Sequence, residues 1–269
     1  MDTHASMELV ELDRDHPGFR DPVYRARRNA IARVAMEYRP GEPVPDTPYT
    51  TVEHGVWRHV WDHLRPVHRR KACGRYRAAL AQLELPTETI PQLSEVNEQL
   101  VGTFQLQPVA GLVTPQRFLT GLAQGVFYST QYVRHHGTPL YTPEPDVIHE
   151  LVGHAPLLQD PLFAEVNRAF GRAAQRSGPV QMEALIRLYW YTVEFGVVRE
   201  EGAIKAYGAG LLSSFGELER IDTAPELRPF DVARIAVTDY DPTDYQPVLF
   251  LAEDLDQALT TLVTYLEQV

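Results

Sequence analysis

Residues 143–156 read PEPDVIHELVGHAP and place two imidazoles and three carboxylates within fourteen residues bounded by prolines. Asp146 is placed to cap a helix that begins after it, and His149 then lies in the first turn. His154 follows five residues later, so on an unbroken α-helix the two rings would point about 140° apart. Gly153 can end the helix between them. We therefore expect the two rings to converge because the helix breaks at this glycine.

The spacing of these histidines differs from that of a familiar zinc motif. Zinc peptidases carry His-Glu-x-x-His, with the histidines four residues apart on one helical face and the glutamate as general base. Residues 149–154 read HELVGH, which is one residue longer. The two histidines are candidates for a different metal site, and the alternative that they are ordinary polar side chains beside a turn stays open.

Glu194 is the candidate for a third ligand, since it is the only charged residue in the apolar run 188–198. A buried, ionised carboxylate is costly unless a metal or an arginine compensates its charge, and both alternatives stay open. Ile186, Trp190 and Glu194 follow at four-residue spacing, so the carboxylate should share a helical face with bulky apolar groups. Two histidines and one carboxylate form the facial triad that holds non-haem iron(II) and leaves coordination positions open.

Further motifs accompany the candidate triad. They lie at residues 15–19, 21–28, 108–112, 141–154, 192–196 and 205–214. Over roughly residues 15–266 the sequence resembles the pterin-dependent aromatic amino acid hydroxylases, and most closely those members that act on phenylalanine. The resemblance implies the catalytic-domain fold of that family, a mainly α structure with a few short β-strands (α+β).

The resemblance also implies roles for individual residues. Iron(II) would be held by His149, His154 and Glu194. Tetrahydrobiopterin or a related tetrahydropterin would bind at Gly111, Val113, Phe118, Glu150 and Tyr189, with O2 as co-substrate. The amino acid substrate would contact Arg134, Tyr141, Thr142, Pro145, Trp190, Phe195, Gly210 and Ser213. Glu150, Trp190 and Ser213 are the residues expected to act in catalysis, and Asp146 is expected to orient His149.

The reaction implied is hydroxylation of L-phenylalanine to L-tyrosine, a step of aromatic amino acid catabolism. Trp190 lies where family members that act on phenylalanine carry tryptophan and those that act on tryptophan carry phenylalanine. Pro242 lies where the tyrosine-specific members carry aspartate, although the phenylalanine-specific members are expected to carry valine there. The alternatives are the same chemistry on tryptophan or at the meta position of phenylalanine, and, more remotely, a zinc hydrolase that uses the same three ligands.

Composition and net charge limit the classes of partner that the protein is expected to bind. The 269 residues are 44% hydrophobic and 23% charged, which is typical of a soluble globular protein. The net charge of −11 argues against nucleic acid or an anionic membrane as partner, and the basic run 65–70 is interpreted as a solvated helix face. Cys73 is the single cysteine, and no run has signal-peptide or membrane-spanning character. We expect a cytoplasmic protein whose only partners are small molecules, as a monomer or alternatively a dimer.

The predicted organisation is one catalytic domain, residues 15–269, after a poorly ordered extension, residues 1–14. Apolar periodicity predicts helices near 31–38, 56–64, 65–85, 90–101, 115–122, 163–170, 185–198 and 255–266. Short strands are expected at 104–110, 203–207 and 245–251. His135 and His136 are not expected to be ligands, because adjacent side chains point apart on any regular element.

Overall fold

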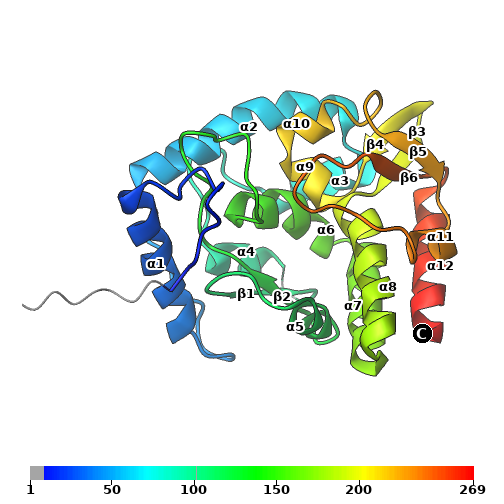
Figure 1. Cartoon of the computed structure of the whole chain (residues 1–269), viewed down its shortest axis with the longest axis horizontal. Helices are drawn as coiled ribbons and strands as arrows, with labels where there is room; N and C mark the ends of the chain where they lie inside the picture. Colours follow the sequence, from blue (N-terminus) through cyan, green and yellow to red (C-terminus); the bar gives the residue numbers. More distant parts are fainter. Residues whose placement is uncertain (1–8, 101) are drawn as a thin grey trace, which may run out of the picture.

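The computed structural model describes residues 9–100 and 102–269, and helices make up most of it (Figure 1). The α-helices are α1 (Pro22–Glu37), α2 (Thr51–Lys71), α3 (Gly74–Leu83), α4 (Leu93–Gln99), α5 (Pro115–Leu122), α6 (Ala155–Leu158), α7 (Pro161–Arg176), α8 (Pro179–Tyr189), α9 (Ala209–Ser213), α10 (Phe215–Leu218), α11 (Val232–Ile235) and α12 (Leu255–Gln268). Two segments are π-helices, η1 (His149–His154) and η2 (Trp190–Glu194). The strands are β1 (Gln105–Pro108), β2 (Val126–Ser129), β3 (Val197–Glu200), β4 (Ala203–Ala206), β5 (Glu226–Pro229) and β6 (Val248–Ala252). The predicted mainly helical α+β class is confirmed.

The strands form two small sheets. In the four-stranded sheet the order is β4-β3-β6-β5, with β3 antiparallel to β4 and parallel to β6. Strands β1 and β2 form a separate parallel pair. The β3–β4 hairpin turns at Glu201 and Gly202, whose φ angles of 52° and 75° match the two left-handed positions of a type I′ turn. Because β3 begins just after η2, this sheet fixes the end of the segment that carries Glu194.

Close packing between helices positions α5 and α8. Helices α7, α8 and α12 run side by side (Figure 1), and α7 contacts both α8 and α12. A Cβ added at Gly171 of α7 would come within 2.0 Å of the backbone nitrogen of Ala123, so α7 and the end of α5 approach at backbone distance. Phe170 of α7 packs against Tyr189 of α8, with ring centroids 5.1 Å apart. This packing sets the position of the α5 side chains relative to α8.

Two predicted helices are wrong in extent. The stretch 65–85 is two helices, since the basic run closes α2 and α3 begins at Gly74. The break occurs because the backbone there pairs elsewhere: Ala72 bridges Ala206, and the Cys73 amide donates to the Ala206 carbonyl. The stretch 185–198 is α8 followed by η2 and β3, because Val197 and Val198 join a sheet whose partner strand lies about fifty residues away in sequence. Such long-range pairing overrides a local helical pattern.

Strands β2 and β5 were not predicted. Each has four residues, and β5 reads ELRP without the apolar alternation that marks a strand. The expected strands appear in shortened form as β1, β4 and β6. Within the described residues, no helix has the length and apolar character needed to span a membrane.

The N-terminal segment is described from residue 9 onward. The backbone amides of Leu9 and Val10 donate to the Asn29 side chain of α1 at 3.0 Å, so this part of the predicted extension contacts the helix. Residues 1–8 lie outside the described part of the chain. The prediction of a poorly ordered extension and a single domain from 15 to 269 stays a prediction.

Candidate active site

The two histidines converge because their segment is a π-helix. In η1 the backbone hydrogen bonds link residues five apart, so His149 and His154 lie over one another. Their Nε2 atoms are 3.0 Å apart. The predicted break at Gly153 is wrong, since η1 continues directly into α6. The two imidazole rings converge because the π-helix is wider than an α-helix. A prediction based on α-helical spacing does not describe this geometry.

Gly153 permits a close contact between two helices and does not end a helix. A Cβ at this position would come within 2.7 Å of the Ala209 carbonyl oxygen. Glycine therefore permits η1 to pack against α9 at backbone distance. That contact brings Ser213, at the end of α9, beside the His149 ring.

Glu194 completes the group from the end of η2. Its Oε1 lies 3.0 Å from His154 Nε2, and its Oε2 lies 3.5 Å from His149 Nε2. One ligand atom from each of the three residues lies within 4.8 Å of the others. Donor atoms at this spacing can coordinate one ion together, and His/His/Glu is the donor set of the facial triad.

For His149 and Glu194, the electrostatics favour the protonation states that bind metal. Burial lowers the pKa of His149 to about 4, although Glu194 opposes the shift. Burial alone would raise the pKa of Glu194, but His154 and His149 more than offset this and lower it. A neutral imidazole and an ionised carboxylate are the forms that ligate a metal. Burial would lower the pKa of His154, yet Glu194 outweighs it and raises this pKa, so a metal would have to displace a proton that this ring holds more readily than usual.

Ser213 orients the His149 ring. Its hydroxyl lies 3.0 Å from His149 Nδ1 and donates to the Ala209 carbonyl at 2.8 Å. Because the hydroxyl proton is already engaged, the hydroxyl oxygen accepts from Nδ1–H, which leaves the Nε2 lone pair free for a metal. The expectation that Asp146 orients this ring is wrong, since Asp146 accepts from the backbone amide of His149 at 3.1 Å and does not reach the ring.

Asp146 is occupied by Arg134. The guanidinium donates through Nε to Oδ2 at 2.9 Å and through Nη2 to Oδ1 at 2.8 Å, and the Arg134 backbone amide adds a bond to Oδ2 at 2.8 Å. Both side chains are buried. Burial alone would raise the pKa of Asp146, but the charge of Arg134 and these hydrogen bonds lower it. The pair uses the side-on edge of the guanidinium, and Arg134 also lines the cavity.

Glu150 lies beside the triad without joining it. Its Oε1 accepts from the backbone amide of Thr130 at 3.3 Å and from the Thr130 hydroxyl at 3.1 Å. Burial raises the pKa of Glu150 to about 7. The carboxyl is therefore held by Thr130 at the wall of the cavity.

A single cavity of about 730 Å³ gathers the predicted site residues. It is lined by the metal candidates His149, His154 and Glu194, by Gly111, Val113, Phe118, Glu150 and Tyr189, and by Arg134, Tyr141, Thr142, Pro145, Trp190, Phe195, Gly210 and Ser213. The residues span about one hundred positions in sequence and come from α5, α8, α9, both π-helices and the loops between them. Every predicted site residue thus reaches the same cavity, although their individual roles stay predictions.

Two aromatic groups shape the walls of the cavity. The Phe118 ring stands edge-on to Phe127 and Tyr189, with ring centroids 5.3 and 5.6 Å away, and its side chain is half-buried at the cavity. Trp190 stacks on Tyr240 at 4.3 Å and lies 4.6 Å from Phe195. Its indole Nε1 donates to Gln246 Oε1 at 2.9 Å. The indole is therefore held by two aromatic contacts and by a hydrogen bond at its nitrogen.

Gln246 and Glu217 line the cavity and were missed by sequence reasoning. The Gln246 amide nitrogen donates to the carbonyls of Asp241 and Asp244 at 2.8 and 3.0 Å, which ties the 241–246 loop to Trp190. The Gln246 backbone amide donates to Glu217 Oε1 at 3.1 Å. Ser214 and Glu217 have the spacing of a helix capping box. In the sequence, Glu217 therefore indicates the start of a helix, and nothing there indicates that it belongs to a functional site.

Glu217 should make stability depend on pH. Burial raises the pKa of Glu217 from 4.5 to about 7, so the folded state holds this proton more tightly than the unfolded state. Stability should fall as pH rises from about 4.5 to about 7, by at most roughly 3 kcal/mol and by less because the side chain is partly solvated. We expect Glu217→Gln to remove this loss in urea unfolding at pH 5 and pH 8. An unchanged difference between the two pH values in Glu217→Gln would contradict the assignment.

Comparison with known proteins agrees with this geometry. The family described as biopterin-dependent aromatic amino acid hydroxylase matches residues 2–269. The chain is 45% identical to phenylalanine-4-hydroxylase of Bos taurus over 96% of its own length, and 44% identical to tyrosine 3-monooxygenase of Homo sapiens over 96%. It spans only 59% and 50% of those two proteins. A crystal structure of Chromobacterium violaceum phenylalanine hydroxylase with bound iron(III) and 7,8-dihydrobiopterin is similar with a TM-score of 0.79 and 29% identity, over 90% of each chain. The chain belongs to the biopterin-dependent aromatic amino acid hydroxylases.

Proposed function

We propose that this protein is an iron(II)- and tetrahydropterin-dependent monooxygenase that converts L-phenylalanine to L-tyrosine with O2. The observation that carries the proposal is the His149, His154 and Glu194 triad, set in a cavity large enough for a flat cofactor and an amino acid together. Iron and pterin, when bound, supply the activation of oxygen. The protein contributes binding, orientation and exclusion of water.

The pterin side of the cavity is assigned to α5 and the loop before it. The half-buried ring of Phe118, which lines the cavity, offers a stacking surface for a flat bicyclic ring. A Cβ at Gly111 would meet nothing within 4 Å, so a ligand can approach the backbone there. Val113, Tyr189 and Glu150 line the same cavity. A carboxyl with a pKa near 7 can accept or donate a hydrogen bond to the ring nitrogens of a pterin.

The substrate side is assigned to Arg134. Arginine has five N–H donors, and Asp146 uses only the side-on edge of the guanidinium. Nη1 and the second hydrogen of Nη2 can therefore form two parallel bonds to the carboxylate of an amino acid. Tyr141, Thr142, Pro145, Gly210 and Ser213 would complete this part of the pocket.

The choice of phenylalanine rests on the cavity wall, because the relatives include enzymes named for phenylalanine and for tyrosine. Trp190 stacks on Tyr240, contacts Phe195 and donates to Gln246, so these contacts oppose its rotation away from a larger ring. Pro242 lies at the rim and offers no polar group to a phenolic hydroxyl. Both features favour a single unsubstituted ring.

Trp190→Phe should shift the preference toward tryptophan. A misfit of one methylene in an apolar pocket changes kcat/KM by roughly 10- to 200-fold. The misfit of a second ring should change kcat/KM by at least that factor. The measurement is competition between equal phenylalanine and tryptophan, with both products quantified. Trp61→Phe is the matched control, since Trp61 is a buried core residue of α2 and should leave the ratio unchanged. Wild-type protein that prefers tryptophan would refute the substrate assignment.

We also propose a cytoplasmic location and a monomer. Cys73 is buried and unpaired, which suits a reducing compartment. Sedimentation of the purified protein tests the monomer, since a mass of twice 30.5 kDa would indicate a dimer.

A further inference from the structure

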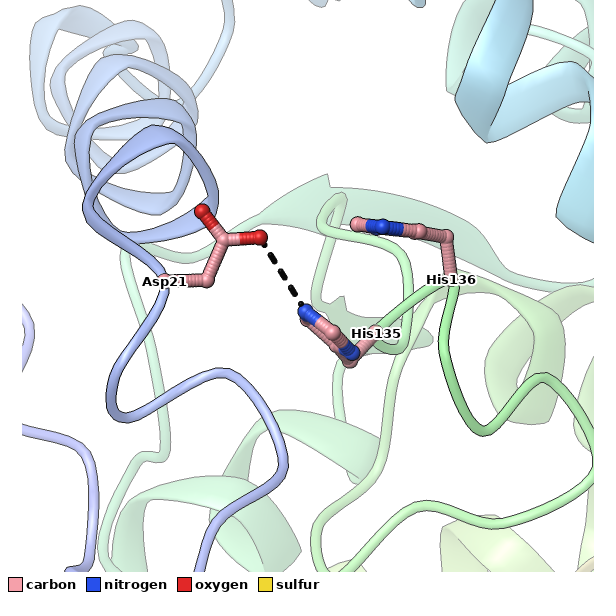
Figure 2. A group of neighbouring side chains, drawn as sticks. All are labelled: Asp21, His135 and His136. Carbon is pink, nitrogen blue, oxygen red and sulfur yellow. Dashed lines mark hydrogen bonds and ion pairs between the residues drawn. The ribbon is translucent and has the colours of Figure 1, made fainter.

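A second group of metal-ligating side chains lies outside the cavity, formed by Asp21, His135 and His136 (Figure 2). Adjacent histidines were expected to point apart, and here that expectation is wrong. The rings lie with centroids 4.4 Å apart at an interplanar angle of 34°. Residues 130–135 form neither helix nor strand, so the alternation of regular elements does not apply. One ligand atom from each of the three residues lies within 4.8 Å of the others.

Asp21 is held in place by the start of α1. As the N-cap residue it accepts through Oδ1 from the backbone amides of Val23 and Tyr24, at 2.9 and 3.0 Å. Its other oxygen, Oδ2, faces His135 Nε2 at 3.2 Å (Figure 2). The bond from the Tyr24 amide and the contact with His135 lower the pKa of Asp21. The carboxylate is therefore ionised and oriented without using the oxygen that faces the histidines.

His135 is fixed on a second side by Tyr24. The Tyr24 ring stands edge-on to it with centroids 5.0 Å apart, and the Tyr24 hydroxyl donates to the Val133 carbonyl at 2.9 Å. The loop and the helix are thus already joined at this point. His136 is exposed, so the group opens to solvent on that side.

One donor pair of this group has the spacing found in the triad, and the His136 donor lies within 4.8 Å of the other two. Pairs of donor atoms in the triad lie 3.0 to 3.5 Å apart, and the Asp21–His135 pair lies 3.2 Å apart. Among the described residues, these two groups are the ones in which three such side chains converge. An ordinary hydrogen-bonded pair would explain Asp21 and His135 alone, but it gives no reason for the placement of the His136 ring beside them, 4.4 Å from the His135 ring.

We propose that Asp21, His135 and His136 form a second site for a divalent transition-metal ion of the imidazole-preferring class, such as zinc(II), separate from the triad. Two imidazoles and one carboxylate select such ions over magnesium or calcium, which prefer oxygen ligands. Water would fill the remaining coordination positions on the exposed side. The site would join the N-cap of α1 to the loop directly after Arg134.

Binding requires one rearrangement of His135. Its Nδ1 now accepts from the Gly137 backbone amide at 3.1 Å, so the ring proton lies on Nε2 and is donated to Asp21. A metal takes the place of that proton between Nε2 and Oδ2, and the proton moves to Nδ1. The Gly137 amide then turns to solvent, which its exposed position permits. The loss of this bond makes the second site weaker than the triad.

The test is zinc binding by protein whose triad is first filled with iron(II) under anaerobic conditions. Equilibrium dialysis against zinc(II), with both metals measured in each sample, should give one zinc per chain and undiminished iron. His136→Ala should weaken zinc binding by at least about 10- to 100-fold, the range that loss of an outer-shell partner alone produces. Zinc should also raise the thermal midpoint of the wild type and not that of His136→Ala.

His63→Ala is the matched control. His59 and His63 lie one turn apart on α2 with ring centroids also 4.4 Å apart, so this pair is the competing surface site. The control should bind zinc as the wild type does. Asp21→Asn keeps a capping oxygen but removes the charge, and should weaken zinc binding while the fold is retained. Unchanged binding in His136→Ala, loss of binding in His63→Ala, or zinc uptake matched by iron release would each overturn the proposal.

Discussion

Glu194→Ala is expected to abolish pterin-coupled hydroxylation and to weaken iron binding by more than about 10- to 100-fold, since that range applies to loss of an outer-shell partner. The two remaining ligands, His149 and His154, cannot hold the ion in a facial arrangement. The measurements are iron content after dialysis and tetrahydropterin-dependent oxygen uptake. Full activity with unchanged iron content would contradict the assignment of Glu194 as a ligand.

Ser213→Ala should have a smaller effect on iron binding and activity than Glu194→Ala. It removes the hydroxyl that accepts from His149 Nδ1 but leaves all three ligands. Iron affinity should fall within the range of about 10- to 100-fold that such partners contribute, and activity should recover at high iron concentration. Glu194→Ala should not recover in this way. The contrast separates loss of a ligand from loss of its orientation.

Asp146→Ala is expected to be the most destabilising single substitution at the site, by about 3 to 5 kcal/mol. It leaves the buried Arg134 without its counter-charge, and breaking one side of a buried ion pair costs this much. It also removes the acceptor for the His149 backbone amide at the start of η1. Urea unfolding at neutral pH measures the change.

Asp231→Ala is the control for the capping part of that loss. Asp231 caps α11 through the amides of Ala233 and Arg234, and its side chain is exposed. Its replacement should cost about 0.5 to 2 kcal/mol, the usual value for an N-cap. An Asp146→Ala loss no larger than this would mean that the Arg134 pair contributes little to stability.

The candidate ligands could be identified from sequence because their chemistry is unusual for their surroundings. Glu194 is an isolated charge in an apolar run, and residues 143–156 concentrate imidazoles and carboxylates. The geometry that unites them could not be predicted, since both segments are π-helices and α-helical spacing places His149 and His154 apart. A break at Gly153 was expected because, with α-helical spacing, the two rings could converge only if the helix ended between them.

Other parts of the site depend on contacts between distant segments. The partner of the His149 ring is Ser213, sixty-four residues away, and the choice of Asp146 for this role followed from nearness in sequence. Gln246 reaches Trp190 from a loop fifty-six residues away. Capped amphipathic helices such as α5, with Thr114 before Pro115, were predicted correctly because their signals are local. Strands β2, β3 and β5 were not predicted as strands, because their pairing partners define them.

The central claim is tested most directly by product analysis of anaerobically iron-loaded protein given phenylalanine, a tetrahydropterin and a measured amount of O2. The account predicts L-tyrosine as the product, with oxygen uptake that needs both iron and the pterin and that stops in Glu194→Ala. Tightly held zinc with amide hydrolysis and no oxygen uptake would contradict it, as would hydroxylation at the meta carbon of the ring.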